Sequence, residues 1–355
     1  RRQRQMCIRD RGVGNVGEKF IDQIQKQAQY LRNNLHINVR IAGLANSRTM
    51  YFDEEGIDLD NWKALLPQGE PSNFDGFVHK IKALNLRNSI FVDNTASHEV
   101  AATYAQYLKN SIGVVTCNKV ACSSEFSNYK YLKNLSRQYN APFLFETNVG
   151  AGLPIIDTLK NLIASGDRVH KIQAVLSGSL NFIFNNFNDS TAFRDVVKQA
   201  MVEGYTEPDP KIDLSGVDVK RKLVILIRES GYEMEIDNIA TISFLPDECM
   251  ATNNNDDFLV SLEKNADHFN ALYKKAADNG DRLKFVASFE NGKANVGLQF
   301  IPQSHPFYNL EGKDNIVLFY TDRYADQPLI IKGAGAGADV TASGIFADVI
   351  RIGNR

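Results

Sequence analysis

Residues 204–222 hold the side chains whose types and spacing are best suited to chemistry. The stretch contains four carboxylates, three lysines and two prolines, and the apolar run 223–227 follows directly. Asp218 and Lys222 are four residues apart, so in a helix they share one face. A lysine on a largely buried helix is expected to have a lowered pKa, which suits proton transfer near neutral pH. A surface ion pair without chemistry is the alternative interpretation.

The same stretch predicts the backbone that carries this pair. Pro208 and Pro210 disfavour a helix in its first half and indicate a stiff acidic loop. Ser215 is a suitable N-cap, so we expect a helix over residues 216–229. The apolar run within it predicts that this helix is mostly buried.

A glycine-rich pattern near the start of the chain indicates dinucleotide binding. Residues 12–17 read Gly-Val-Gly-Asn-Val-Gly and lead into a segment with a helical apolar stripe. In this motif the pyrophosphate lies at the N-terminus of the helix, although the pattern alone also arises by chance. The expected contacts are Gly12, Val13, Gly14, Asn15, Val16 and Gly17. The preceding residues 6–11 are charged, so we expect a poorly formed first strand and weakened cofactor binding.

Strands that end in polar residues follow the glycine pattern. The strands expected at residues 39–45, 89–93, 113–116 and 143–145 alternate with helices, which is typical of an open parallel sheet that binds ligands at its carboxyl edge. Arg48 follows the first of them and favours the 2′-phosphate of NADP over NAD; a solvated arginine is the alternative. Thr95 and Lys119 lie where a nicotinamide or a substrate would bind, although Lys119 is also explained as a surface charge.

The pattern changes after Pro154, where a second domain is expected. Strands are predicted near residues 171–176, 283–289, 294–300 and 315–321, and the glycine loop 333–337 leads into an apolar helix. We therefore predict an α/β protein. A Rossmann-type NAD(P)-binding domain spans residues 1–150, and the helix of 335–355 returns to it. An α+β domain spans residues 151–334.

Composition excludes several classes of protein. The chain has 355 residues, 43% of them hydrophobic, and a net charge of −2, which excludes a disordered chain and gives no reason to expect nucleic acid or membrane partners. No apolar run is long enough for a membrane span, and no signal peptide is visible. The four cysteines lack CxxC spacing and the six histidines are scattered, so a cytoplasmic protein without a zinc site is expected.

Taken together, the motifs resemble those of homoserine dehydrogenase, and most closely the dehydrogenase half of bifunctional aspartokinase/homoserine dehydrogenase. The resemblance covers residues 12–352, nearly the whole chain. It is carried by residues 12–17, 93–95, 116–119, 147–154, 176–181, 204–222 and 333–349.

The resemblance implies NAD(P)-dependent interconversion of L-homoserine and L-aspartate 4-semialdehyde, on the route to threonine, methionine and isoleucine. Lys222 would donate and accept the proton, Asp218 would lie beside it, and Lys119 would lie near both nicotinamide and substrate. The substrate ammonium would be received by Glu207 and Asp213, and the rest of the pocket would be formed by Tyr205, Ser179 and Gly178. Thr95 and Gly337 would contact the cofactor.

The resemblance also implies a monovalent cation, sodium in the family, and an oligomer. The cation would be bound by Glu146 and the backbone carbonyls of Val149, Ala151 and Leu153. The second domain would be catalytic and would pair subunits into a homodimer or homotetramer. A parent protein with a fused aspartokinase domain is compatible with the resemblance. The sequence contains no such domain and no regulatory domain, which puts threonine feedback through such an appendage in doubt.

Two other interpretations stay open at this point. The chain could be another NADP-linked dehydrogenase that acts on a small amino or hydroxy acid. It could instead be a catalytically impaired fragment whose cofactor site is defective because of residues 1–11.

Overall fold

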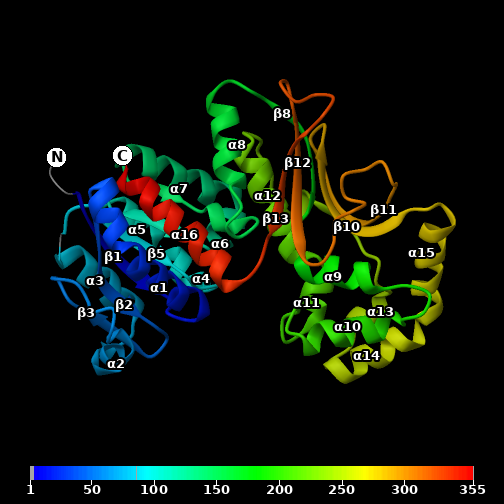
Figure 1. Ribbon diagram of the computed structural model, residues 1–355, viewed down its shortest axis with the longest axis horizontal. Helices are drawn as coiled ribbons and strands as arrows, with labels where there is room; N and C mark the ends of the chain where they lie inside the picture. The colour runs from blue at the N-terminus through cyan, green and yellow to red at the C-terminus, as the bar shows by residue number, and fades with distance from the viewer. Residues whose placement is uncertain (1–3, 85, 355) are drawn as a thin grey trace. The chain divides into compact units, whose positions relative to one another are not determined.

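The computed structural model describes residues 4–84 and 86–354, which divide into two compact units (Figure 1). Unit 1 contains the chain up to Pro154 together with the C-terminal segment that begins at Gly337. Unit 2 is continuous and consists of Ile155–Ala336. Each unit is built from a sheet and helices, so the α/β class expected from the sequence is confirmed.

The described part of unit 1 forms a seven-stranded sheet in the order β4-β3-β2-β1-β5-β6-β7. Strands β2, β1, β5, β6 and β7 run parallel, and β3 and β4 extend one edge in antiparallel fashion. The strands are β1 (Arg4–Arg11), β2 (Ile37–Ala45), β3 (Thr49–Phe52), β4 (Glu70–Pro71), β5 (Ser89–Asp93), β6 (Gly113–Thr116) and β7 (Phe143–Leu144). The parallel core places the carboxyl ends of β1, β5 and β6 at one edge.

Helices cover both faces of this sheet. They are α1 (Asn15–Tyr30), α2 (Trp62–Leu65), α3 (Phe74–Leu84), α4 (His98–Ala102), α5 (Tyr104–Leu108), α6 (Val120–Ser123), α7 (Phe126–Gln138) and α16 (Ala338–Gly353). The C-terminal α16 lies beside α1, where Phe346 and Phe20 make an edge-to-face ring contact (Figure 1). Phe77 of α3 and Tyr104 of α5 make ring contacts with Phe91 of β5.

The expectation that the first strand is poorly formed is wrong. Strand β1 pairs in parallel with both β2 and β5 and lies at the centre of the sheet. Its ladder hydrogen bonds involve only the backbone, so charged side chains do not prevent pairing. Arg9 and Asp10 are nevertheless fully buried, and Arg11 is 7% exposed. Arg11 is accommodated because its guanidinium lies over the ring of Phe74.

Arg9 is accommodated by a local irregularity of the sheet. The register between β1 and β2 shifts after Ile8, so that Arg9 lies opposite Gly43. A Cβ atom at Gly43 would lie 3.0 Å from Cγ of Arg9 and 2.7 Å from the ring of Phe52. A glycine at this position therefore leaves room for the arginine stem.

Asp10 is only partly satisfied by hydrogen bonds. Its Oδ1 atom accepts a hydrogen bond of 2.8 Å from Nδ2 of Asn94, and its Oδ2 atom has no partner among the described residues. Burial, together with the nearby charge of Asp93, raises the pKa of Asp10 to about 8. The carboxyl group is therefore protonated in the folded protein at neutral pH.

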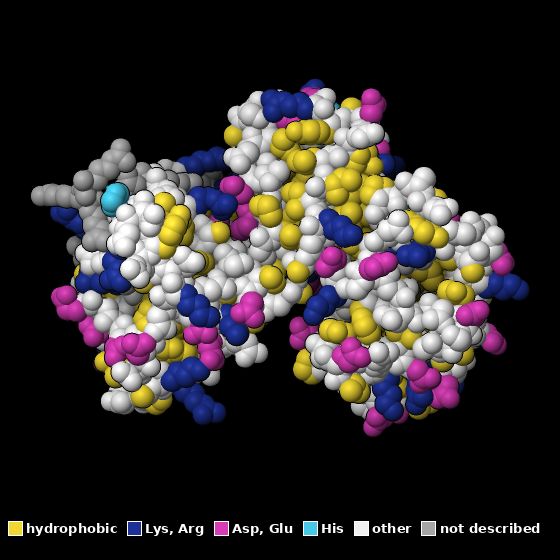
Figure 2. All heavy atoms as spheres, viewed as in Figure 1, with side chains coloured by type: hydrophobic (Ala, Val, Ile, Leu, Met, Phe, Trp, Pro, Cys, Tyr) yellow, Lys and Arg dark blue, Asp and Glu magenta, His cyan; other side chains and the backbone are white. Residues whose placement is uncertain are grey.

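Unit 2 contains a six-stranded sheet, over its described residues, in the order β13-β12-β8-β10-β11-β9. All neighbours are antiparallel except β11 and β9. The strands are β8 (Val169–Val175), β9 (Ala240–Ile242), β10 (Arg282–Glu290), β11 (Lys293–Ile301), β12 (Asp314–Thr321) and β13 (Leu329–Ala334). They include the four strands expected from the sequence. Hydrophobic side chains gather on the surface over β8 and β12 (Figure 2).

The helices of unit 2 are α8 (Ile155–Ala164), α9 (Gly178–Asn186), α10 (Phe193–Val202), α11 (Pro210–Leu214), α12 (Val217–Glu229), α13 (Asp247–Met250), α14 (Asn255–Lys264) and α15 (Ala266–Asp278). Helix α12 confirms the predicted buried helix, and its residues 223–229 are all buried. Within residues 4–84 and 86–354, each helix is too short or too polar to cross a lipid bilayer.

The loop before α12 differs from its prediction in two ways. Helix α11 begins at Pro210, because proline is tolerated in the first turn, and Asp209 caps it by accepting from the backbone N–H of Lys211. The N-cap of α12 is Gly216 in a left-handed conformation, rather than Ser215. A Cβ atom at Gly216 would lie 2.4 Å from the ring of Phe285, so glycine is required both for the turn and for the packing.

We predict that Asp10→Asn stabilises unit 1 and removes a pH dependence. The folded protein keeps the Asp10 proton up to about pH 8, whereas the unfolded chain releases it near pH 4. The free energy of unfolding of the wild type therefore falls as pH rises from 4 to 8. At pH 8 the variant should be more stable than the wild type by about 3–5 kcal/mol.

Fluorescence of Trp62, the single tryptophan of the chain and a buried residue of unit 1, reports this unfolding in urea. The expected gap between variant and wild type widens from pH 5 to pH 8 and then stays constant. Parallel stability curves over that range would contradict the burial of a protonated Asp10.

Candidate active site

Lys222 lies at the centre of the candidate site in unit 2. Its Nζ atom lies 2.8 Å from Oδ2 of Asp218 and donates a 2.7 Å hydrogen bond to the backbone carbonyl of Leu176. The lysine side chain is 11% exposed, whereas that of Asp218 is 44% exposed. An ammonium has three donors, and these two acceptors are its partners among the described residues. One N–H therefore stays available for a ligand.

A second polar cluster joins α11 to α9. Oδ1 of Asp213 accepts a 2.9 Å hydrogen bond from the hydroxyl of Ser179, and Oδ2 accepts a 2.7 Å bond from the backbone N–H of Glu207. Burial raises the pKa of Asp213, while these two hydrogen bonds lower it. The charges of Asp218 and Lys222 also act on Asp213, which indicates that the two clusters are neighbours.

The first turn of α9 connects the two clusters through the chain itself. Ser177 directly follows Leu176 and caps α9 by accepting from the backbone N–H of Leu180. The hydroxyls of Ser177 and Ser179 lie 2.9 Å apart. A Cβ atom at Gly178 would lie 3.1 Å from the carbonyl oxygen of Lys313, so glycine allows the two segments to approach closely.

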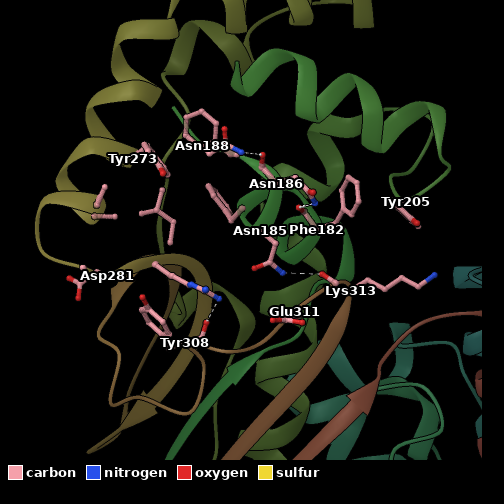
Figure 3. Close-up of a pocket in the computed structure, with 18 residues that line it drawn as sticks. Phe182, Asn185, Asn186, Asn188, Tyr205, Tyr273, Asp281, Tyr308, Glu311 and Lys313 are labelled. Carbon is pink, nitrogen blue, oxygen red and sulfur yellow. Dashed lines mark hydrogen bonds between the residues drawn. The ribbon is translucent and has the colours of Figure 1, made fainter. Parts of the chain in front are cut away.

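Tyr205, the remaining residue predicted in this unit, lies at the edge of a neighbouring cavity. Its ring centroid is 4.6 Å from that of Phe182, and Nζ of Lys313 lies 5.1 Å from the Tyr205 centroid. The cavity has a volume of about 910 Å³ and extends from Tyr205 to Tyr273 and Tyr308 (Figure 3). Among the described residues that line it, Tyr205 is the sole predicted site residue.

The sequence prediction missed Asn315, which lies beside Lys222. The Nδ2 atom of Asn315 donates a 3.4 Å hydrogen bond to the same Leu176 carbonyl that Lys222 contacts. Its Oδ1 atom is buried and has no partner among the described residues. A Cβ atom at Gly335 would overlap the amide of Asn315, so the glycine loop accommodates this side chain.

In unit 1 the glycine loop has the geometry that a bound dinucleotide requires. Gly12 has φ of +107°, and a Cβ atom there would lie 2.7 Å from Cγ2 of Thr95. Gly14 is the N-cap of α1, and a Cβ atom there would meet no atom within 4 Å, which leaves the backbone open to a phosphate group. A Cβ atom at Gly17 would lie 2.8 Å from the Gly12 carbonyl. Asn15 and Val16 form the first turn of α1, and Val13 N–H is bonded to Ala45 O.

A buried polar network holds the ends of β5 and β6 together beside this loop. Asp93 accepts hydrogen bonds from Thr95 N–H at 2.8 Å, from the Tyr104 hydroxyl at 2.5 Å and from Asn118 Nδ2 at 3.0 Å. The Tyr104 hydroxyl also lies 2.7 Å from that of Thr116. The network fixes Thr95 and positions Lys119, which directly follows Asn118 and is half-buried at the start of α6.

The other predicted cofactor residues occupy turns of unit 1. Arg48 is exposed in the hairpin between β2 and β3, where Asn46 Oδ1 accepts from its backbone N–H at 2.7 Å. The same hairpin contacts the glycine loop, because Gly12 N–H donates to Ala45 O. Gly337 is the N-cap of α16 and has φ of +121°, a conformation that favours glycine.

The residues predicted to bind a cation lie together in one turn of unit 1. Glu146 is 4% exposed, and its Oε2 atom lies 3.9 Å from Nη1 of Arg351. Gly150 and Ala151 both have positive φ, so the backbone reverses sharply between Val149 and Leu153. Within the described residues no group of three or more His, Cys, Asp or Glu side chains could bind a metal ion. A cation here would depend on backbone carbonyls.

Both units of this chain are similar in sequence to known proteins. Residues 154–350 match the homoserine dehydrogenase family, and residues 12–146 match the homoserine dehydrogenase NAD-binding domain. The bifunctional aspartokinase/homoserine dehydrogenase 1 of Zea mays is 41% identical over 96% of this chain and 38% of its own length. The homoserine dehydrogenase of Schizosaccharomyces pombe is 38% identical over 96% of this chain and 93% of its own. The chain therefore spans less than half of the bifunctional relatives.

Solved structures share the fold of this chain. A Candida auris protein of unknown function has a TM-score of 0.90 at 34% identity and matches 99% of both chains. A hyperthermophilic archaeal homoserine dehydrogenase in complex with NADPH has a TM-score of 0.76 over 98% of both chains, and at 24% identity it shows a shared fold. The resemblance inferred from the motifs is thus confirmed, and this chain belongs to the homoserine dehydrogenase family.

Proposed function

We propose that the chain catalyses the NAD(P)-dependent interconversion of L-homoserine and L-aspartate 4-semialdehyde. The observation that carries this proposal is the Lys222 ammonium, which is fixed by Asp218 and the Leu176 carbonyl with one N–H available. It lies in the part of the chain that matches the family. Oxidation of an alcohol releases one proton along with the hydride, so a positioned amine is sufficient for the protein's share of the chemistry.

In this proposal the neutral amine form of Lys222 accepts the hydroxyl proton of homoserine during oxidation, and its ammonium form donates a proton during reduction of the aldehyde. Asp218 and the Leu176 carbonyl hold the amine in place and stabilise its charged form. The bound nicotinamide supplies the hydride acceptor or donor. The proton leaves the alcohol oxygen and the hydride leaves the carbon bonded to it. The reaction is therefore balanced without a further oxidant.

Asp213 and Glu207 are proposed to bind the substrate ammonium. The two residues are already joined, because the Glu207 backbone N–H donates to Asp213. The Ser179 hydroxyl fixes the other oxygen of Asp213, which keeps the carboxylate oriented. Gly178 and Tyr205 complete the pocket. A zwitterionic substrate is recognised well by such paired carboxylates.

The cofactor would be bound by the glycine loop of unit 1, with Thr95, Lys119 and Gly337 as further contacts. The open Gly14 backbone and the N-terminus of α1 fit a pyrophosphate. Arg48 follows β2, where the 2′-substituent of the adenosine ribose is read in this fold, and it supports NADP over NAD. The archaeal relative whose structure contains NADPH is consistent with this preference.

A monovalent cation, sodium by family resemblance, is proposed at Glu146 with the carbonyls of Val149, Ala151 and Leu153. The buried carboxylate and the sharp turn support an all-oxygen site. The guanidinium of Arg351 already lies near Glu146, so the cation would share this carboxylate with an arginine. Its contribution would be to stiffen the turn rather than to take part in proton transfer.

The proposed assembly is a homodimer or homotetramer formed through unit 2. Hydrophobic side chains gather over β8 and β12 (Figure 2), and Ile330 in the neighbouring β13 is 45% exposed. Fusion to an aspartokinase domain in the parent protein is supported by the bifunctional relatives. A cytoplasmic location stays a prediction, since the maize relatives are named chloroplastic.

The alternative of an impaired fragment depended on a poorly formed first strand. Because β1 is paired on both sides, the structure removes that reason. A different small amino or hydroxy acid as substrate is separated from homoserine by a substrate panel with NADP as oxidant.

We predict that Lys222→Ala lowers kcat for homoserine oxidation by about 10²–10⁴-fold, because the proton acceptor is lost. Reduction of NADP at 340 nm measures this. Lys220→Ala removes an ammonium from the same helix and serves as the matched control, with activity expected within twofold of wild type. Equal activities of the two variants would contradict the assigned role of Lys222.

Arg48→Ala is expected to raise the KM for NADP by about tenfold or more, since a charge-assisted contact to the 2′-phosphate is lost. The KM for NAD should stay within twofold. Arg32→Ala, an exposed arginine just beyond the opposite end of α1 from the glycine loop, is the control. A parallel loss of affinity for both cofactors would indicate that Arg48 does not read the phosphate.

A further inference from the structure

Lys284 of β10 is a fully buried lysine without a carboxylate partner among the described residues. Its side chain is 0% exposed, and among the described residues no Asp or Glu oxygen lies within ion-pair distance of it. Its Nζ atom instead donates to three neutral oxygens: Oδ1 of Asn181 at 2.9 Å, Oδ1 of Asn185 at 2.5 Å and the Leu310 carbonyl at 2.5 Å. The ammonium thus uses all three of its donors.

The two asparagines extend this cluster to the turn before β12. Nδ2 of Asn181 donates to the Gly312 carbonyl at 3.1 Å. Nδ2 of Asn185 donates to the carbonyl of Gly312 at 3.2 Å (Figure 3) and to that of Leu310 at 3.1 Å. Both amides lie on α9, one helical turn apart. Lys284 therefore ties α9 to the turn 310–314 through one continuous set of hydrogen bonds.

Both segments that Lys284 joins lead directly to the candidate substrate site. The first turn of α9 carries Gly178 and Ser179, and Ser179 orients Asp213. The turn 310–314 continues into Asn315, which donates to the Leu176 carbonyl that also accepts from Lys222. A shift of α9 or of the turn would thus displace the acceptor of the catalytic amine and the hydroxyl that fixes the carboxylate.

We propose that Lys284 is a positioning residue for the substrate site, which holds α9 and the turn 310–314 in the arrangement that Ser179, Asp213 and Lys222 require. The proposal rests on the proposed function, because the reaction defines what must be positioned. Lys284 does not touch the proposed substrate contacts itself. It acts through Asn181 and Asn185.

The chemistry of the cluster favours a lysine for this role. Lys284 donates to two amide oxygens and one backbone carbonyl, and an apolar side chain would remove the donor that the two amide oxygens have in this structure. Burial lowers the pKa of Lys284 to about 7, with Arg282 and Lys332 adding to the effect and Glu311 opposing it. A lysine is retained here although burial penalises its charge, because its N–H groups satisfy oxygens that an apolar side chain would leave without that donor.

The test compares Lys284→Met with Lys284→Arg in the full chain. Methionine keeps most of the volume but removes the donors, whereas arginine restores them. We expect Lys284→Met to raise the KM for homoserine by about tenfold to a hundredfold, because reacting groups are displaced by a fraction of an ångström. The dissociation constant for NADPH should stay within twofold. Lys284→Arg should recover most of the homoserine affinity.

Lys275→Met is the matched control, since Lys275 lies over the ring of Phe300 in the same unit and, among the described residues, its side chain makes no hydrogen bond or ion pair with α9 or the turn. A folded Lys284→Met enzyme with wild-type KM and kcat would overturn the proposal. So would an identical effect of Lys275→Met, or an equal loss of NADPH and homoserine affinity.

Hydrogen exchange separates this proposal from the proposed function. Lys284→Met should increase amide exchange in residues 178–186 and 310–315 while exchange in α12 changes little. If wild type fails to oxidise homoserine, the proposed function is wrong, and the exchange data alone decide whether Lys284 orders these segments. Unchanged exchange in both segments would overturn the positioning role.

Discussion

The backbone carbonyl of Leu176 is the acceptor on which the candidate site of unit 2 depends. It belongs to the residue that follows β8, where the sheet ends and α9 is about to begin. A buried carbonyl needs a donor, and a largely buried ammonium needs acceptors, so Leu176 and Lys222 satisfy each other. Asn315 contacts the same oxygen from the neighbouring strand. The carbonyl at the end of β8 thereby holds the Lys222 amine, which would move the proton. The carboxylate that also contacts this amine, Asp218, is partly exposed.

Buried charge has opposite consequences in the two units. In unit 2 the Lys284 ammonium finds an oxygen for each of its hydrogens, and those oxygens belong to the segments that carry the site. In unit 1 Asp10 is equally buried, but one of its oxygens has no partner among the described residues. We therefore interpret Lys284 as part of the working architecture and Asp10 as a cost to stability. Strand β1 still forms, because its pairing with β2 and β5 depends on the backbone.

Much of the fold and part of the site could be predicted from local patterns. The glycine loop, the strand ends and the spacing of Asp218 and Lys222 are short-range features that fix local geometry, and the structure has them as expected. The prediction that β1 would be poorly formed was wrong because it relied on the charged side chains of residues 6–11. A central strand is held by backbone hydrogen bonds to the strands on both sides, and these do not depend on side-chain polarity. The start of α11 at Pro210 was missed because the prolines were taken only as helix breakers. Leu176, Asn315 and Lys284 left no local signal, since their contacts join residues far apart in the sequence.

A crystal structure with NADPH and L-homoserine bound tests the central claim most directly. The account predicts the homoserine hydroxyl oxygen about 3 Å from Nζ of Lys222, within hydrogen-bond reach for proton transfer, while Lys222 keeps its bond to the Leu176 carbonyl. The substrate ammonium should lie against Asp213 and Glu207. Homoserine bound in the cavity between Tyr205 and Tyr308, with Lys222 contacting no substrate atom, would contradict it.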